Sequence, residues 1–204
     1  MTNLLKESGA LPAISSDHLT ASTTPKEPKS KTELLTNSNT NIRIAGWTND
    51  SITDGPGLRF VLFVQGCERN CPGCHNPSTH SRNGGRWTTV NEVLNEINRN
   101  PILDGITLSG GEPFLQPSPL AVLSKEVRRR SLSVVVYTGF TFEEILCSGN
   151  ADQLALLHET DILVDGPYIE SERSLALKFR GSANQRVIDI QQSLNTKKII
   201  EHFW

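Results

Sequence analysis

Apolar runs suited to buried strands alternate along this chain with segments whose apolar residues recur at helical spacing, and this alternation limits the fold more than any other feature. Strands are expected at residues 58–65, 105–108, 132–137 and 161–164. Helices are expected at residues 88–97, 119–130, 142–146 and 152–158. Strands and helices in this order form a parallel sheet with right-handed crossover connections.

The stretch from residue 55 to residue 190 is too short for eight full strand–helix units, so a closed barrel of that kind is not expected. The strand–helix units follow one another in the same order but have no sequence similarity to each other, which argues against a solenoid of 20–50-residue repeats. The sequence therefore predicts an α/β fold whose parallel strands form an open sheet or an incomplete βα barrel.

The chain has 204 residues, a length that suits one catalytic domain with a tail. Residues 1–40 are rich in Ser, Thr, Asn, Lys and Pro and show little apolar periodicity, so they are predicted to be a disordered N-terminal extension. The predicted domain covers residues 41–194. Residues 195–204 form a predicted C-terminal extension, for which a short helix is one expectation.

The overall charge gives no sign of a nucleic-acid or membrane partner. The formal net charge is −2 and the pI is near 6.2, so the chain lacks a basic field for polyanions. There is no apolar run of 18 residues, and the first residues do not resemble a secretory signal. A cytoplasmic location is expected, and the reducing cytosol favours metal binding or catalysis over disulfides for grouped cysteines.

Unusual residues follow four of the predicted strands. They are the cysteine loop at 66–77, Gly110-Gly111-Glu112-Pro113, Thr138-Gly139 and Asp165-Gly166-Pro167-Tyr168. Because the carboxyl ends of parallel strands lie at the ligand-binding edge of such sheets, we expect these loops to meet at one site.

Three of the four cysteines, Cys67, Cys71 and Cys74, lie within eight positions at Cys-x3-Cys-x2-Cys spacing. Pro72 and Gly73 prevent a regular helix and let the loop wrap around a bulky inorganic group. Three thiolates can hold three corners of a 4Fe-4S cluster, which leaves the fourth iron for another ligand.

Two other interpretations of the cysteines remain. One is a zinc site completed by His75, His80 or Cys147, and the other is a set of inert buried thiols. His75 directly follows Cys74, so binding the same ion would strain the chain. Cys147 lies at the end of a predicted helix and is expected to be a free cysteine of the hydrophobic core.

The Cys-x3-Cys-x2-Cys spacing after a first strand resembles the radical S-adenosylmethionine superfamily. Within that superfamily, further segments resemble the activating proteins of anaerobic (class III) ribonucleoside-triphosphate reductase. These segments are Asp-Gly-Pro-Gly-Leu-Arg at 54–59, Cys-Pro-Gly-Cys-His-Asn at 71–76, Ser-Gly-Gly-Glu-Pro at 109–113, Asp-Gly-Pro-Tyr at 165–168 and Arg-Gly-Ser-Ala-Asn-Gln-Arg at 180–186. The resemblance runs from about residue 42 to 194, and the last segment is its most specific part.

The resemblance implies that Cys67, Cys71 and Cys74 bind a 4Fe-4S cluster whose fourth iron is chelated by S-adenosyl-L-methionine. It further implies that an electron delivered through the cluster splits this cofactor into methionine and a 5′-deoxyadenosyl radical. That radical would take a hydrogen atom from a glycine of the partner reductase. An electron donor such as flavodoxin or ferredoxin is then needed, and no catalytic residue is expected beyond the cluster and the cofactor.

The same resemblance suggests which residues bind the cofactor. Gly110 and Gly111 lack a Cβ and would let the backbone approach its methionine end, where Glu112 would accept a hydrogen bond from the ammonium group. Gly73 replaces an aromatic residue common in the superfamily but matches the activating proteins, so its backbone contact with adenine, next to Cys74, is retained. His75 stands where the family often has an aromatic residue, and its ring would lie against adenine or at the surface.

Several roles stay open at this point. Asp165 and Tyr168 would line the mouth that admits the partner's glycine loop, or form a plain turn. The polar residues of the 180–186 segment would anchor the cofactor's ribose or carboxylate, or fix a final strand at 187–190; they are Arg180, Asn184, Gln185 and Arg186.

The function also has alternatives. One is activation of a different glycyl-radical enzyme of the pyruvate formate-lyase type, and another is a small-molecule reaction such as 7-deazaguanine ring formation. A zinc-binding interaction module belongs to a different class altogether.

Overall fold

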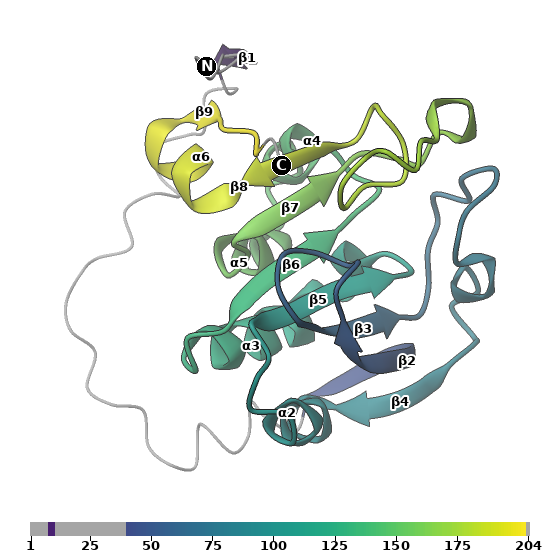
Figure 1. Ribbon diagram of the computed structural model, residues 1–204, viewed down its shortest axis with the longest axis vertical. Coiled ribbons are helices and arrows are strands. Elements are labelled where there is room, and N and C mark those ends of the chain that lie inside the picture. The colour runs from purple at the N-terminus through teal and green to yellow at the C-terminus, as the bar shows by residue number, and fades with distance from the viewer. Residues whose placement is uncertain (1–7, 11–39, 203–204) are drawn as a thin grey trace.

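The computed structural model describes residues 8–10 and 40–202 of the chain. Figure 1 shows the arrangement of its elements. In chain order these are β1 (Ser8–Ala10), β2 (Asn41–Ser51), β3 (Arg59–Val64), η2 (Pro77–Thr79), β4 (Arg86–Thr89), α2 (Val90–Asn98), β5 (Gly105–Gly110), η3 (Pro113–Leu115), α3 (Pro117–Arg128), β6 (Ser133–Tyr137), α4 (Phe142–Ser148), α5 (Ala151–His158), β7 (Ile162–Asp165), η4 (Glu170–Glu172), β8 (Arg186–Asp189), α6 (Ile190–Thr196) and β9 (Lys198–Ile199).

A seven-stranded sheet with the order β4-β2-β3-β5-β6-β7-β8 forms the centre of the fold. The four central strands β3, β5, β6 and β7 are parallel, which confirms the α/β arrangement predicted from the sequence. The flanking strands β2, β4 and β8 are antiparallel to their neighbours, a feature that the sequence analysis did not anticipate. Within the described residues the two outer strands, β4 and β8, do not pair with each other, so the sheet is open.

The central strands form because their residues suit burial on both faces of a sheet. β3 has the sequence Arg-Phe-Val-Leu-Phe-Val, in which every residue but one is fully buried. The outer strand β2 is more polar, and only Ile42 and Ile44 among its eleven residues are buried. β2 and β4 therefore carry little of the apolar signal by which buried strands are recognised.

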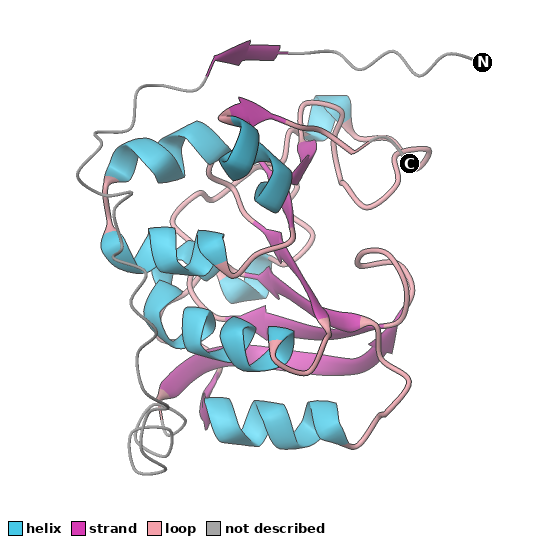
Figure 2. Cartoon of the chain, turned by 90° about the vertical axis from the view of Figure 1, so that its left-hand side faces the viewer, coloured by secondary structure: helices cyan, strands magenta, loops and turns pink. Residues whose placement is uncertain are grey.

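Helices α2, α3 and α5 pack on one face of the sheet, whereas the long loops lie on its other side (Figure 2). Thr89 caps α2 through a reciprocal hydrogen-bonding box with Glu92, and Thr141 and Glu144 do the same for α4. The four predicted helices are confirmed, with ends that differ from the prediction by about two residues or fewer.

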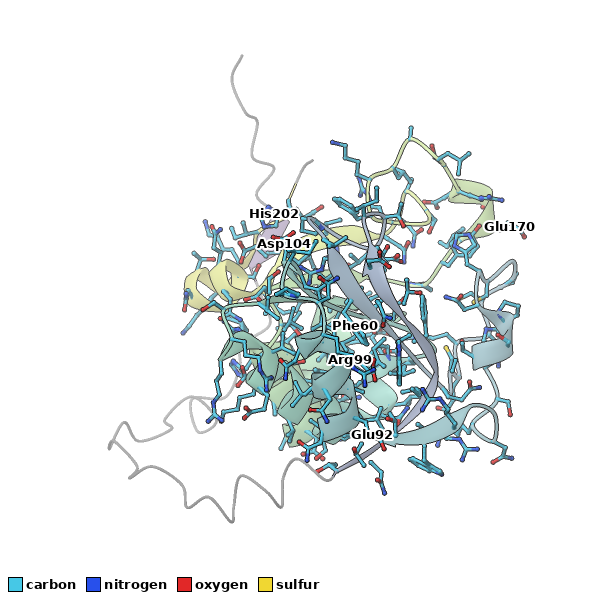
Figure 3. The ribbon with its side chains drawn as sticks, turned by 60° about the horizontal axis from the view of Figure 1, so that its bottom comes forward. Phe60, Glu92, Arg99, Asp104, Glu170 and His202 are labelled. Atoms are coloured by element: carbon cyan, nitrogen blue, oxygen red, sulfur yellow. The ribbon has the colours of Figure 1, made fainter. Side chains whose placement is uncertain are left out.

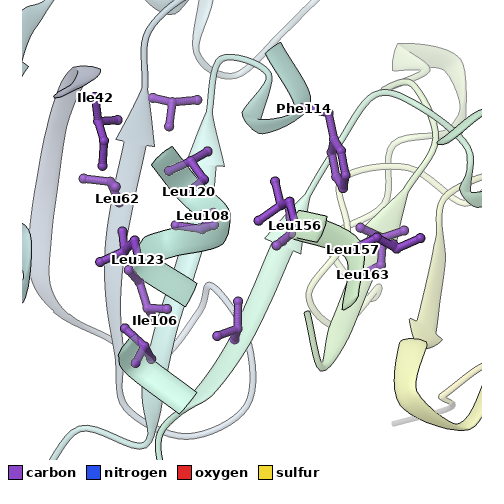
Figure 4. Packing of buried hydrophobic residues seen from close by; sticks show 14 of the residues in the cluster. Ile42, Leu62, Ile106, Leu108, Phe114, Leu120, Leu123, Leu156, Leu157 and Leu163 are labelled. Atoms are coloured by element: carbon purple, nitrogen blue, oxygen red, sulfur yellow. The ribbon is translucent and has the colours of Figure 1, made fainter. Parts of the chain in front are cut away.

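The main hydrophobic core lies between this sheet face and the helices (Figure 4). Fully buried side chains from both layers meet there, including Leu62, Ile106 and Leu108 from the sheet with Leu120 and Leu123 from α3. Burial of one such side chain contributes about 1.5–3 kcal/mol. The core thus fixes the strands, and with them the points from which the loops at their carboxyl ends begin.

Arg59 is fully buried and links three strands on the opposite face of the sheet. Its guanidinium donates to Thr107 Oγ1 at 3.2 Å, to Ser133 Oγ at 2.6 Å and to the carbonyl of Ile106. Burial lowers the pKa of Arg59 to about 10. Thr107 also donates to the carbonyl of Asp54 at 2.7 Å, so the network holds the loop before β3 against the sheet.

The predicted N-terminal extension lies mostly outside the described residues, as do Phe203 and Trp204. Strand β1 from that region pairs antiparallel with β9. Helix α6 crosses residue 194, where we expected the domain to end, and the domain limits remain a prediction. A short helix in the closing segment is wrong for residues 197–202, because Lys197 ends α6 at φ +55° and β9 follows. No helix within residues 8–10 and 40–202 has both the length and the apolar character needed to cross a bilayer.

Candidate active site

A cavity of about 400 Å³ opens where the central parallel strands end, on the side of the molecule from which the cysteine loop and the 166–185 loop extend (Figure 1). The predicted site residues that line it are Cys67, Cys71, Cys74, His75, Gly110, Gly111 and Glu112. Gly73 is not among the described residues that line the cavity. The size lies within the range of pockets that bind small molecules and cofactors.

Backbone hydrogen bonds close the stem of the cysteine loop. Gly66 N donates to Thr79 O at 2.8 Å, and Cys67 N donates to His80 O at 3.0 Å. Within the loop, Gly73 has φ +69°, a conformation that glycine adopts without strain. The chain's own backbone therefore holds the thiols in place.

The thiols fit a metal cluster better than a single ion. In the described part of the chain, no three His, Cys, Asp or Glu side chains are grouped closely enough to hold one metal ion. Three thiols facing a cavity of about 400 Å³ instead suit a larger group such as a 4Fe-4S cluster. Cys147 does not line the cavity, but it is exposed on α4, so its expected place in the hydrophobic core is wrong.

Some of the groups around Cys67 raise the pKa of its thiol and others lower it. Burial raises the pKa of the Cys67 thiol, and the nearby Glu112 carboxylate also raises it. Backbone N–H groups of Arg69 and Asn70 lower that pKa because they donate toward the sulfur. Successive N–H groups of this kind form a concavity that suits anions, including iron–sulfur clusters.

Gly110 and Gly111 allow the ends of β3 and β5 to approach closely. Gly110 has φ +94°, and a Cβ at this position would lie 2.7 Å from the Cα of Phe63. A Cβ on Gly111 would lie 2.4 Å from the carbonyl oxygen of Gly66. Glu112 N then donates to that same oxygen at 2.8 Å, which ties the Gly-Gly-Glu turn to the start of the cysteine loop.

Glu112 is buried, with 2% of its surface exposed, and its carboxylate faces the cavity. Its Oε1 accepts hydrogen bonds from Phe114 N at 3.0 Å and Thr138 Oγ1 at 2.8 Å. Its Oε2 accepts one from Gly139 N at 2.8 Å and keeps a further acceptor position. Burial raises the pKa of Glu112 to about 6, although these hydrogen bonds and the charge of Arg69 lower it. A cation entering the cavity would offset the cost of this buried charge.

His75 packs on Tyr168, with ring centroids 4.8 Å apart and planes inclined by 52°. A Cβ on Gly181 would lie 3.1 Å from the Tyr168 ring and 3.4 Å from the His75 ring. The cysteine loop, the 165–168 turn and the 180–186 segment thus meet at one wall of the cavity.

Asp165 joins neighbouring elements of the fold and does not face the cavity. It is 1% exposed, does not line the cavity, and accepts hydrogen bonds from Phe142 N at 2.7 Å and from Arg186 Nε at 3.0 Å. Arg186 also forms two hydrogen bonds, of 3.0 and 2.7 Å, with the carboxylate of Glu143. These contacts join β7, β8 and the start of α4.

The other polar residues of the 180–186 segment bind the protein backbone. Gln185 Oε1 accepts from Gly181 N at 2.9 Å, and Gln185 Nε2 donates to Gly166 O at 3.0 Å. Asn184 Nδ2 donates to Pro167 O at 2.8 Å, and Arg180 Nη1 donates to Gln185 O at 2.7 Å. These bonds match the interpretation in which the segment fixes its neighbouring loop and strand.

The sequence analysis named Thr138 and Gly139 among the converging turns but did not predict their bonds to Glu112, and it gave no role to Arg69. Thr138 and Gly139 hold Glu112, Tyr137 lines the cavity, and the Arg69 guanidinium lies 4.2 Å from the centre of the Phe140 ring. Their positions in the sequence point to the site, because residues 137–139 end a predicted parallel strand and Arg69 lies between two of the cysteines.

Comparison with known proteins agrees with this arrangement. Residues 53–188 match a protein family described as a 4Fe-4S single cluster domain. The anaerobic ribonucleoside-triphosphate reductase-activating protein of Escherichia coli (strain K12) is 37% identical to this chain over 145 residues, or 67% of this chain and 91% of that protein. The chain belongs to this family of activating proteins.

Two further comparisons were found, one with a protein sequence and one with a solved structure. The pyruvate formate-lyase-activating enzyme of Staphylococcus epidermidis is 35% identical over 153 residues, which cover 71% of this chain and 60% of that enzyme. The crystal structure of QueE from Escherichia coli aligns with 55% of this chain and 58% of its own, at a TM-score of 0.43 and 16% identity. The 37% identity to the Escherichia coli activating protein confirms the resemblance that the sequence motifs indicated.

Proposed function

We propose that this chain activates an anaerobic ribonucleoside-triphosphate reductase by forming a glycyl radical on it. The proposal rests on one observation, the convergence of three cysteines and a buried glutamate on a single cavity at the strand ends, in a member of the activating-protein family. It includes the assignment of the fold as an incomplete βα barrel of the radical S-adenosylmethionine type.

The proposed cofactors are a 4Fe-4S cluster and S-adenosyl-L-methionine. Together they supply reductive cleavage of the sulfonium to methionine and a 5′-deoxyadenosyl radical, which is able to take a hydrogen atom from a glycine. Cys67, Cys71 and Cys74 would hold the cluster, since they are the thiols that face the cavity. A flavodoxin or ferredoxin is the proposed electron donor.

The chain's own residues bind and orient the cofactor in this proposal. The free acceptor position of Glu112 would take the methionyl ammonium, in a buried setting where a charge-assisted hydrogen bond is strong. Gly110 and Gly111 have no side chain, so their backbone would be accessible beside the ammonium group. The paired rings of His75 and Tyr168 would provide an aromatic wall for the adenine end, next to Gly73 and Cys74.

The test is anaerobic reconstitution with iron and sulfide, followed by reduction in the presence of S-adenosyl-L-methionine. We expect 5′-deoxyadenosine, and a glycyl radical signal in electron paramagnetic resonance when the reductase is added. Cys→Ser variants at 67, 71 and 74 should each lose iron and product. Absence of 5′-deoxyadenosine from an iron-replete wild-type chain would refute the proposal.

A second candidate function is activation of a pyruvate formate-lyase-type enzyme, which the 35% identical relative favours. The two functions differ only in the partner glycine. Incubation of one reconstituted preparation with each partner in turn separates them, because the glycyl radical should appear on the reductase and not on pyruvate formate-lyase.

A further inference from the structure

A second, smaller cavity of about 140 Å³ lies between the 176–180 loop, strand β8 and the stretch after β9. Its lining residues are Ala176, Leu177, Lys178, Arg180, Val187 and His202. Nothing in the proposed function uses this cavity, because none of the cluster or cofactor residues lines it.

Basic residues make up half of the lining, and the other half is apolar. Lys178, Arg180 and His202 all border the cavity, and no Asp or Glu is among its described lining residues. Within the described residues neither Lys178 nor Arg180 has a carboxylate partner, since the bond formed by Arg180 goes to the carbonyl of Gln185. Asp189 Oδ2 lies 3.3 Å from His202 Nε2 and offsets part of the charge. The cavity keeps an excess of positive charge.

The size of the cavity limits its ligand. Pockets that enclose whole drug-sized or nucleoside ligands begin at about 300 Å³, roughly twice this volume. A water molecule occupies about 30 Å³ in the liquid, so the space suits a small tetrahedral anion with its first waters. Arginine and lysine are the residues by which proteins bind phosphate groups.

We propose that this cavity binds a phosphate group, either as free phosphate or as the terminal phosphate of a nucleotide whose nucleoside stays outside. Lys178 and Arg180 supply the charge, and His202 completes the wall.

The phosphate site lies next to the large cavity in the chain but is separate from it. Gly181 and Gln185 line the large cavity, whereas Arg180, from the same 180–186 segment, lines the small one. Figure 3 shows His202, beside the small cavity, far from Glu170, whose carboxylate lies against Gly73 of the cysteine loop. A bound phosphate would hold Arg180, which donates to the carbonyl of Gln185, a residue that lines the large cavity.

The experiment uses the full chain, reconstituted anaerobically, and measures phosphate binding by calorimetry and by the shift in melting temperature at constant ionic strength. Lys178→Gln removes one charge from an exposed position without breaking a hydrogen bond of the described structure. Lys178→Arg keeps the charge. Lys125→Gln, on the exposed side of α3, is the matched control.

We expect saturable binding at one site and a melting temperature that rises with phosphate but not with chloride. Lys178→Gln should weaken phosphate binding about fivefold or more, while Lys178→Arg and Lys125→Gln stay within about twofold of wild type. ATP that binds more tightly than phosphate, with the same loss in Lys178→Gln, identifies a nucleotide as the source. Equal binding of the two identifies the phosphate group alone as the ligand.

Two results would overturn the proposal. One is a phosphate effect no larger than that of chloride at the same ionic strength. The other is equal phosphate affinity in Lys178→Gln and Lys125→Gln. Neither result bears on the activase, whose assay depends on the three cysteines and the large cavity.

Discussion

Replacing Glu112 with glutamine separates the charge of this side chain from its shape. Its pKa is raised by burial from 4.5 to about 6, a shift of roughly 1.5 pH units that corresponds to about 2 kcal/mol. Because the folded pKa lies above the unfolded one, the stability contributed by this group is fully present below pH 4.5 and is lost as the pH rises through 6. Glutamine does not titrate, so this dependence should vanish in Glu112→Gln.

The assay is urea unfolding of wild type and Glu112→Gln from pH 4.5 to 7.5. The difference in free energy of unfolding between the two chains should change by about 1.5 kcal/mol in favour of the variant over this range, since part of the ~2 kcal/mol is already lost at pH 4.5. Other titrating groups are common to both chains and cancel. Glutamine also places its NH₂ against a backbone donor, Gly139 N or Phe114 N, which costs about 1–3 kcal/mol at every pH and does not alter the slope.

The same variant tests the proposed contact with the cofactor. Loss of a charge-assisted hydrogen bond costs about 1.5–3 kcal/mol, so Glu112→Gln should bind S-adenosyl-L-methionine about 10- to 150-fold more weakly at pH 7.5. Wild-type affinity should fall below pH 6 as Glu112 takes up a proton. Glu172→Gln, an exposed change outside the large cavity, is the control and should bind normally. Affinity in Glu112→Gln within twofold of wild type, with the same pH profile, would refute the reasoning.

Three further changes have defined outcomes. Gly111→Ala should lose about 1–3 kcal/mol in urea unfolding because its Cβ meets the Gly66 carbonyl, whereas Gly46→Ala, with open space around the Cβ, should change by less than about 1 kcal/mol; equal effects would contradict the packing argument. Arg186→Leu leaves the Asp165 carboxylate buried without a cation and should cost about 3–5 kcal/mol, part of which Asp165→Asn should restore in the double variant. Cys147→Ser should keep its full iron content after reconstitution, since this exposed thiol lies outside the cavity, and loss of iron would give it a role in the cluster.

The central strands and the helices between them were predictable because burial leaves a strong mark on sequence. β3, β5, β6 and β7 are runs of apolar and β-branched residues, and β5 and β6 each end in the turn that the site uses. The strands β2, β4 and β9 escaped prediction because they are polar, short or at an edge, where few side chains are buried. The apolar run at 187–190 predicts a strand, but the strand β8 ends at Asp189 and Ile190 is the first residue of helix α6.

In the site, the cysteines and the Gly-Gly-Glu turn could be found from residue type and spacing. The partners of Glu112 could not, because Thr138 and Gly139 reach it only through the pairing of β5 with β6. The Arg186–Asp165 pair likewise depends on the antiparallel register of β7 and β8, in which these two residues lie directly opposite each other. Contacts between residues distant in sequence are set by topology, and no local pattern records them.

The closed stem of the cysteine loop has a consequence for damage by air. Backbone hydrogen bonds from Gly66 N to Thr79 O and from Cys67 N to His80 O hold the ends of the loop together. These bonds join backbone atoms and not the thiols, so the ends of the loop should stay joined when oxygen destroys the proposed cluster. Such a chain should recover its iron after reduction without being unfolded first, provided that its sulfurs have not been oxidised beyond the sulfenic state. The chain would then stay folded after exposure to air, and the cell would be able to restore its cluster.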